Sequence, residues 1–226
     1  MKIVKTVFKY LGLVICALFS MAICQLPTLE ETPVFSVNSQ AEFNEAMRSV
    51  NLSRNILLFI LFAIIAFIVE WYFCKLAGNK IAFNKKVNMK GMLLAIAGGI
   101  ISFIFAYIIS RIVKSNGFDI MTATLRSKLA ILLILGVVVV GPIVEELCFQ
   151  GGIQKGIFKR LNPWISILLT AIIFAIFHNA DLDIFFLDKV LDGIIFGYVY
   201  QKTDDIKMPI LSHSILNFLI TVFAYL

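Results

Sequence analysis

The sequence predicts an all-α membrane protein, a bundle of about seven transmembrane helices with its functional site in the C-terminal half. Of the 226 residues, 60% are hydrophobic and only 15% are charged, whereas a soluble domain is about half apolar and a quarter charged. The apolar residues also form stretches of about 20, the length that crosses the hydrocarbon core of a bilayer. The chain length fits one integrated membrane domain, in which N-terminal helices and loops (1–127) precede a core region (128–226).

The N-terminal half predicts three spans. The first covers about 5–24 and starts with basic residues; no convincing small-residue cleavage site follows, so we interpret it as a retained helix and not as a signal peptide. The polar stretch after it includes a short surface helix at 41–49. Two further spans are expected at about 55–74 and 91–110, and Ala97-Gly98-Gly99 in the latter predicts a close helix contact.

The C-terminal half predicts four more helices. Gly141-Pro142, inside the first of them, can bend that helix and open space beside it. The second begins at Asn162-Pro163, because proline is favoured in the first turn of a helix. The helix that contains Pro142 is expected to end near residue 158, and the next helix to cover 163–178. The third is expected to end near residue 200, and the last to cover 209–226.

The charge distribution excludes some partners and predicts an orientation. A net charge of +6 would suggest nucleic acid in a soluble protein, but here Lys and Arg lie between apolar stretches and no nucleic-acid-binding motif is present. Lipid headgroups and topology explain these residues better. They are densest before the first span, between the second and third, and after the fourth. The positive-inside rule therefore predicts a cytoplasmic N-terminus. We expect an integral protein of a bacterial plasma membrane.

Five polar residues lie in apolar stretches of the C-terminal half, where an ionisable side chain is costly. They are Glu145, Glu146, His178, His213 and Asn217, and they include both histidines of the chain. His213 and Asn217 are four residues apart and share one helical face. Glu145 and Glu146 point about 100° apart on a helix, so each needs a different partner.

We expect Glu146 to hydrogen-bond Gln150, four residues later, and Glu145 to share a water molecule with His178. The contact between Glu145 and His178 requires that both side chains lie at the same depth of the membrane. If the fourth span ended near Glu146, Glu145 and His178 would lie at opposite depths of the membrane. The sequence therefore predicts one long helix over about 129–158.

The polar set has the chemistry of a hydrolase. A carboxylate in an apolar site can act as a general base, and an imidazole can orient the same water. A second imidazole and an amide can donate hydrogen bonds to a developing oxyanion. Glu145, His178 and His213 could also ligate zinc, although the chain has no HExxH motif. A proton relay in a transporter is a further reading, but no second half with broken helices is apparent.

Three motifs carry a resemblance to a known family. GPIVEELCFQGGIQKGI (141–157), FAIFH (174–178) and HSILN (213–217) resemble the EExxxR, FxxxH and HxxxN motifs of the CPBP family. This family contains CAAX prenyl endopeptidases and bacteriocin-processing or self-immunity proteins, also called the Abi family. The resemblance covers about 128–218 and implies an intramembrane endopeptidase of a type often described as a metallopeptidase.

The resemblance also implies roles for the polar residues. Glu145 would activate the water as general base, His178 would hold that water, and Glu146 would support the site. His213 and Asn217 would stabilise the oxyanion. Because the set lacks a tight ligand motif, we favour a metal-free mechanism over zinc.

One residue departs from the family pattern, since Gln150 replaces the motif arginine. A neutral amide compensates a carboxylate less well than a guanidinium does. The sequence therefore leaves two functions open. The first is an endopeptidase acting on a membrane-embedded peptide or protein. The second is a catalytically weak or inactive relative that acts as a membrane binding, regulatory or bacteriocin immunity protein.

Other polar residues in apolar stretches are interpreted as structural. Lys189 is expected to pair with a neighbouring aspartate, Asp188 or Asp192, near a helix start. Glu70, beside Trp71 and Tyr72, is expected to be solvated at the membrane interface. The four cysteines form no CxxC pair and are interpreted as buried, small apolar residues.

Overall fold

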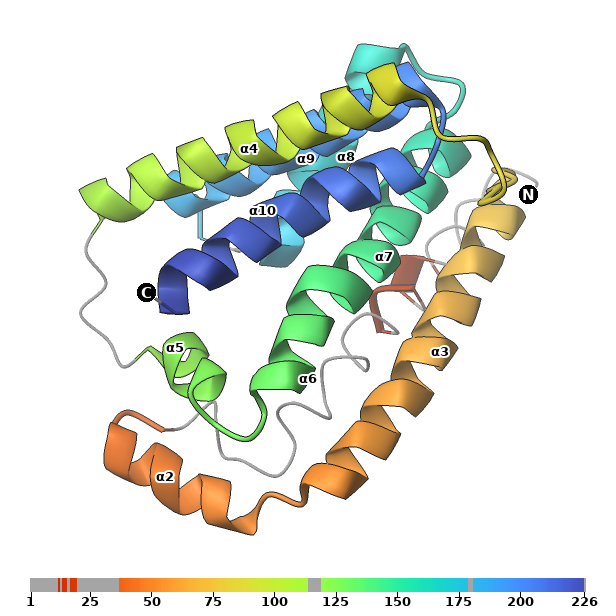
Figure 1. Cartoon of the computed structure of the whole chain (residues 1–226). Helices are drawn as coiled ribbons and strands as arrows, with labels where there is room; N and C mark the ends of the chain where they lie inside the picture. The colour runs from red at the N-terminus through yellow and green to blue at the C-terminus, as the bar shows by residue number, and fades with distance from the viewer. Residues whose placement is uncertain are drawn as a thin grey trace.

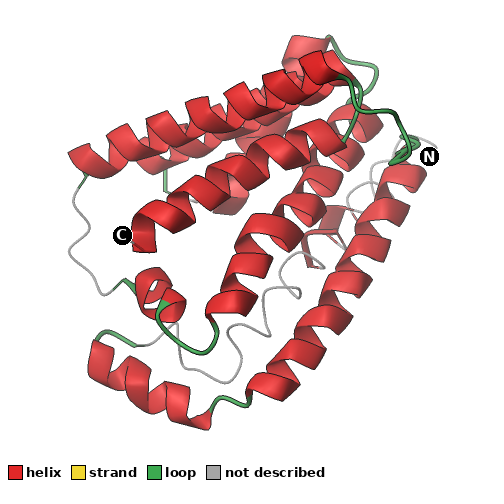
Figure 2. Ribbon diagram, in the orientation of Figure 1, coloured by secondary structure: helices red, strands yellow, loops and turns green. Residues whose placement is uncertain are grey.

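The computed structural model describes residues 12, 14–15, 17–19, 37–113, 119–178 and 181–225. The predicted first span at 5–24 therefore lies largely outside the described residues, as do Cys16 and Cys24. In the described part of the chain every regular element is helical (Figure 2). The predicted all-α class is confirmed.

Three helices cover most of the described residues between 37 and 113, and their ends follow from local capping. Helix α2 (Gln40–Ser49) begins after Ser39, whose hydroxyl accepts a hydrogen bond from the Glu42 amide. Helix α3 (Leu52–Ala77) ends at Gly78, which adopts the left-handed conformation (φ 88°) that glycine permits. Helix α4 spans Met89–Ile112. These bounds enclose the surface helix and the two spans predicted from the sequence.

A short helix, α5 (Ile120–Leu125), follows between α4 and the next span. After it the chain is helical from Ala130 to Ile157, which confirms the predicted long helix. This long helix is not uniform. Its parts are α6 (Ala130–Leu135), the π-helical η3 (Gly136–Val140), α7 (Gly141–Glu146) and the π-helical η4 (Leu147–Ile157).

Pro142 explains the first π-helical segment. Proline has no N–H, and its ring clashes with the carbonyl group four residues earlier in an α-helix. In η3 the Gly141 N–H bonds to the carbonyl of Gly136, five residues earlier. This wider turn lets the helix continue through Pro142, and it lies beside the cavity described below.

The last three helices have the predicted bounds within a few residues. They are α8 (Pro163–His178), α9 (Ile184–Thr203) and α10 (Lys207–Tyr225). Among the described residues, four helices are long and apolar enough to cross a membrane: Leu52–Ala77, Met89–Ile112, Ala130–Ile157 and Lys207–Ala224. The membrane bundle is confirmed, and α8 is a further apolar helix. The number of seven crossings stays a prediction.

Small residues set the helix packing. Gly98 and Gly99 are buried in α4, and a Cβ atom on Gly99 would clash with the Ser212 carbonyl oxygen of α10. This confirms the predicted close contact. Likewise, a Cβ atom on Gly193 of α9 would lie 2.7 Å from the Cα atom of Ala171 in α8. The hairpin of α8 and α9 therefore packs backbone against backbone, beside α4 and α10 (Figure 1).

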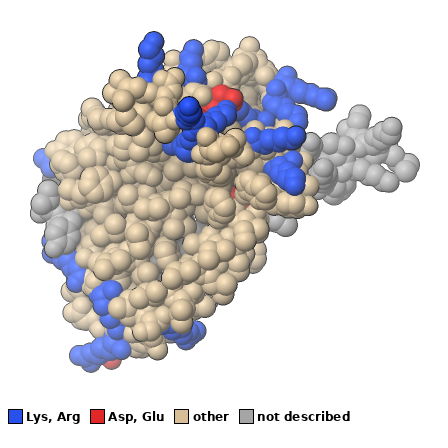
Figure 3. All heavy atoms as spheres, turned by 45° about the vertical axis from the view of Figure 1, so that its right-hand side comes forward, with Lys and Arg blue, Asp and Glu red and all other residues tan. Residues whose placement is uncertain are grey.

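The molecule has two chemically different ends. The basic end holds the loops 78–88, 158–162 and 204–206, where Lys85 and Lys155 form ion pairs with Asp204. Lys and Arg gather at this end, and a wide band with few charged side chains follows it (Figure 3). The opposite end, called here the α5 end, holds α2, α5 and the last turn of α10, and the Thr122 hydroxyl donates to the Ala224 carbonyl there.

Glu70 corrects one prediction, because it is completely buried and not solvated. It lies one turn before Cys74, on the face of α3 that packs against η4. The Cys74 thiol donates to the Leu147 carbonyl oxygen, and a Cβ atom on Gly152 would clash with the Phe73 ring. This tight contact places the Glu70 side of α3 inside the protein. Cys74 and Cys148 are buried free thiols, as predicted.

Candidate active site

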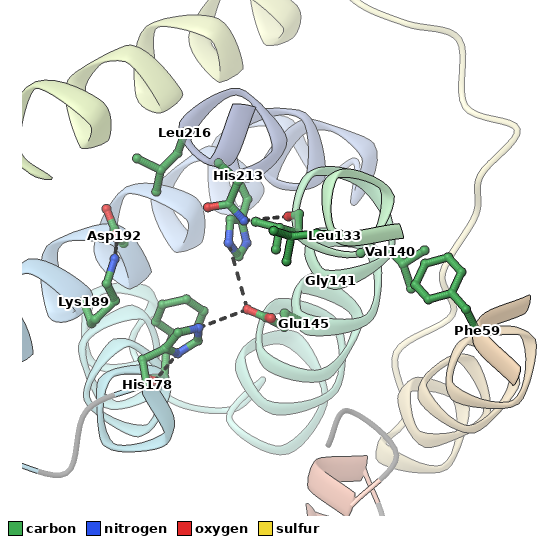
Figure 4. A pocket seen from close by; sticks show the side chains of 14 residues that line it. Phe59, Leu133, Val140, Gly141, Glu145, His178, Lys189, Asp192, His213 and Leu216 are labelled. Carbon is green, nitrogen blue, oxygen red and sulfur yellow. Dashed lines mark hydrogen bonds and ion pairs between the residues drawn. The ribbon is translucent and has the colours of Figure 1, made fainter. Parts of the chain in front are cut away.

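A cavity of about 320 Å³ lies inside the bundle, in the half toward the α5 end (Figure 4). Its wall is built by α3, the long helix from α6 to α7, the end of α8, the start of α9 and the middle of α10. Most of the lining is apolar. The polar lining residues are Glu145, His178, Lys189, Asp192, His213 and Asn217.

Glu145 is the centre of this polar group. Its Oε2 atom lies 3.2 Å from Nε2 of His178 and 3.9 Å from Nε2 of His213. The three side chains come from α7, α8 and α10 and point toward one another (Figure 4). The long helix brings Glu145 to the depth of His178, as its predicted continuation required.

The His178 ring has a fixed proton arrangement. Its Nδ1 lies 2.9 Å from the carbonyl oxygen of Phe174, and a carbonyl only accepts, so Nδ1 carries a hydrogen. Nε2 therefore has two possible roles toward Glu145. It accepts a hydrogen bond from the protonated carboxylic acid, or, when the ring is an imidazolium, it donates a hydrogen bond to the carboxylate. In both cases Glu145 and His178 hold one proton between them, which a water molecule in the cavity can exchange.

Glu146 corrects a second prediction. Its Oε1 atom lies 2.9 Å from Nδ1 of His213, and not beside Gln150. Both amide atoms of Gln150 lack a hydrogen-bond partner within the described chain, although the side chain is fully buried. The reason is the π-helical geometry of η4, in which residues five apart, and not four, are in register. Gln150 points toward α9, where its Oε1 would lie 3.4 Å from a Cβ atom on Gly197.

Asn217 lies on the cavity wall, and its amide nitrogen donates to the Val137 carbonyl oxygen over 2.8 Å. In a regular α-helix that carbonyl would accept from the N–H of Gly141. Here Gly141 bonds to Gly136, and the next residue, Pro142, has no N–H. Asn217 thus satisfies the carbonyl group that the π-helical segment leaves free, and it ties α10 to the wall of the cavity.

Lys189 and Asp192 were expected to be structural only, and the structure also places them on the cavity wall. The Lys189 ammonium lies 2.6 Å from Oδ2 of Asp192 and 3.2 Å from Oδ2 of Asp188, so the predicted ion cluster is confirmed. Their position in the site follows from the short connection between α8 and α9. Because α8 ends at His178 and α9 begins already at Ile184, the first turns of α9 lie at the depth of that histidine.

The predicted zinc alternative finds no support in the arrangement of side chains. Across the described ranges, no group of three or more His, Cys, Asp or Glu side chains is placed to hold a metal ion. Each histidine uses Nδ1 for a protein acceptor, and Oε2 of Glu145 already contacts Nε2 of His178 directly. We therefore derive no chemical step through a metal ion.

Comparisons with known proteins address the same region. Residues 127–219 match the family described as type II CAAX prenyl endopeptidase Rce1-like. A Bacillus subtilis (strain 168) protein described as "Putative membrane peptidase YdiL" is 32% identical over 84 residues, which are 37% of this chain and 34% of that protein. The chain thus matches about a third of the length of this relative. No solved structure matches the chain.

These matches confirm the resemblance to the CPBP family for the C-terminal half. The residues matched to the family include Glu145, Glu146, His178, His213 and Asn217, and the structure brings their side chains to one cavity and its immediate border. The chain is an integral membrane protein whose residues 127–219 are similar to the CAAX prenyl endopeptidase family.

Proposed function

We propose that this protein is an intramembrane endopeptidase that hydrolyses a peptide bond of a membrane-associated peptide or protein, with a water molecule activated by Glu145. One observation carries the proposal most strongly. Oε2 of Glu145 lies near Nε2 of both histidines at the wall of a cavity within the membrane bundle. All three residues lie in the region that matches the CAAX endopeptidase family.

In the proposed reaction the Glu145 carboxylate takes a proton from the water as its oxygen attacks the peptide carbonyl carbon. His178 stabilises the carboxylate before this step and shares the proton after it, because the two side chains hold protons jointly. The same pair then gives the proton to the leaving amine, and the C–N bond breaks. A positioned acid–base pair of this kind accelerates such a step by about 10²–10⁴-fold.

We assign the oxyanion to the side of the cavity formed by α10. Glu146 fixes the His213 ring through Nδ1, so Nε2 of His213 faces Glu145 and the cavity. An orienting carboxylate behind a catalytic imidazole has the same effect in other hydrolases. Asn217 uses one amide hydrogen for Val137, which leaves its second hydrogen as a donor to the substrate.

The second candidate function is a weak or inactive relative that acts through binding, for example as a bacteriocin immunity protein. The observation that favours it is the incomplete hydrogen bonding of the Glu146 and Gln150 side chains. Oε2 of Glu146 and both amide atoms of Gln150 have no hydrogen-bond partner among the described residues. The motif arginine would bring charged donors to this position, so its absence leaves the support of His213 incomplete.

The proposed orientation places the basic end on the cytoplasmic side, by the positive-inside rule. The cavity would then open in the half of the bilayer away from the cytoplasm. A cysteine introduced at Arg160, in a basic-end loop, should react with a membrane-impermeant maleimide only after cells are opened. Equal labelling of intact cells would contradict this orientation.

The test of function compares membranes that contain the wild type with membranes that contain Glu145→Gln, at equal abundance. Sequencing of new peptide N-termini by mass spectrometry should find cleavage products with the wild type that Glu145→Gln does not form. Identical products in both samples would refute catalysis by Glu145. Gln150→Arg separates the two candidate functions, because new products found only with this variant would indicate that the wild type acts through binding.

A further inference from the structure

A second cavity of about 320 Å³ lies at the basic end, away from Glu145. It lies between the start of α4 and the corner where α9 meets α10. Four lysines line it, Lys85, Lys86, Lys90 and Lys202, together with one carboxylate, Asp205, while Leu94 and Met208 supply an apolar floor. We propose that this cavity binds the phosphate group of an anionic phospholipid.

The charge balance of the cavity favours an anion. The nearby carboxylates are already paired, Asp205 with Lys207 at 3.3 Å and Asp204 with both Lys85 and Lys155. Lys86, Lys90 and Lys202 form no ion pair with any described residue, and the Lys202 ammonium lies only over the Tyr198 ring. Three like charges around one hollow repel each other, and a bound phosphate removes that repulsion.

The cavity is also held in shape by the fold. The Lys207 ammonium donates to the carbonyl oxygens of Phe83 and Lys85, and the Lys85 ammonium donates to the Asp204 backbone carbonyl. These bonds tie the loop before α4 to the corner of α9 and α10. A Cβ atom on Gly91 would lie 3.2 Å from Cγ2 of Thr203, so α4 and α9 are in close contact beside the cavity.

The surroundings favour a lipid over a free phosphate ion. Val87, Met89 and Leu93 lie next to the cavity at the start of α4 and are 57–62% exposed. Exposed apolar side chains at this depth of a membrane helix contact acyl chains. A phospholipid would use both surfaces at once, with its phosphate among the lysines and its chains along α4, whereas inorganic phosphate would use only the lysines.

The experiment measures lipid binding to the purified full chain by native mass spectrometry in a neutral detergent. The probes are phosphatidylglycerol, phosphatidylcholine and inorganic phosphate. We expect phosphatidylglycerol to bind at least tenfold more tightly than either other probe. Because each basic residue near the membrane surface contributes about a fivefold change in affinity, Lys86→Gln/Lys90→Gln should weaken binding about 25-fold.

The matched control is Lys75→Gln/Arg160→Gln, which removes the same charge from the same end of the protein outside the cavity. We expect it to change the affinity less than twofold. An equal loss in both double variants would overturn the proposal, because the charge of the whole surface would then explain binding. Equal affinity for phosphatidylcholine, or for inorganic phosphate, would overturn it as well. None of these outcomes depends on the proposed peptidase activity.

Discussion

Replacing Asn217 with leucine should destabilise the fold through a single backbone carbonyl group. The Asn217 amide nitrogen lies 2.8 Å from the Val137 carbonyl oxygen. Neither of the next two candidate donors along the helix can replace it, since Gly141 bonds to Gly136 and Pro142 has no N–H. Val137 is half-buried on the cavity wall, and leaving its carbonyl group without a donor costs up to about 1–3 kcal/mol, so we expect the free energy of unfolding to fall by no more than this amount.

Pro142→Ala provides the matched test of this explanation. It restores an N–H five residues after Val137, which is the hydrogen-bond spacing of a π-helix. We therefore expect Pro142→Ala/Asn217→Leu to be destabilised by about 1 kcal/mol less than the sum of the two single variants. The free energy can be measured by SDS-induced unfolding in mixed micelles, followed by tryptophan fluorescence. If the two single effects add without any recovery, the assigned role of the Val137 carbonyl is wrong.

Three further predictions follow from the site and the basic end. Lys189→Met should lower the free energy of unfolding by about 3–5 kcal/mol, because it leaves the buried Asp192 carboxylate unpaired; Lys189→Met/Asp192→Asn should recover part of the loss, and equal stabilities of the two variants would contradict this. Peptide cleavage should persist in EDTA at a concentration that removes zinc, whereas reversible loss restored by zinc would reject the metal-free mechanism. The hydrogen bonds from Lys155 and Lys85 hold the pKa of Asp204 below its usual range. The stabilising effect of Asp204 is therefore present above the ordinary pKa and is lost as the pH falls through the lower folded-state pKa. In thermal unfolding, Asp204→Asn should flatten the dependence of stability on pH below about pH 4, and an unchanged slope would argue against this role of Asp204.

The sequence was sufficient for the fold class and for the grouping of Glu145, His178 and His213 at one cavity. Apolar stretches of spanning length determine where helices form, and α8 begins and ends at the predicted residues. Two histidines in an otherwise apolar region indicated a common site with Glu145, because an isolated ionisable group in a membrane is costly. The long helix from Ala130 to Ile157 followed from the requirement that Glu145 and His178 lie at one depth.

The missed contacts depend on geometry that residue spacing does not contain. The expected bond between Glu146 and Gln150 assumed α-helical spacing, but the π-helical η4 changes which side chains face each other. Unlike the first π-helical segment, η4 contains no proline that would indicate a wider turn. Glu70 was misplaced for a similar reason, since only the packing of α3 on η4 determines which side of α3 is buried.

The pairing of charges explains how so many ionisable groups can line one cavity in a membrane protein. Glu145 contacts His178, Glu146 bonds to His213, and Lys189 is held by Asp192. Each pair nearly cancels its own charge, which offsets much of the cost of burial. The hydrogen bonding of these charged groups is incomplete, however.

Oδ1 of Asp192 lacks a hydrogen-bond donor among the described residues, and this side chain belongs to the cavity wall. Buried acceptors without donors cost about 1–3 kcal/mol each. Water and peptide N–H groups supply such donors, and an apolar lipid chain does not. The cavity should therefore exclude acyl chains and admit water, which the proposed hydrolysis within the membrane requires.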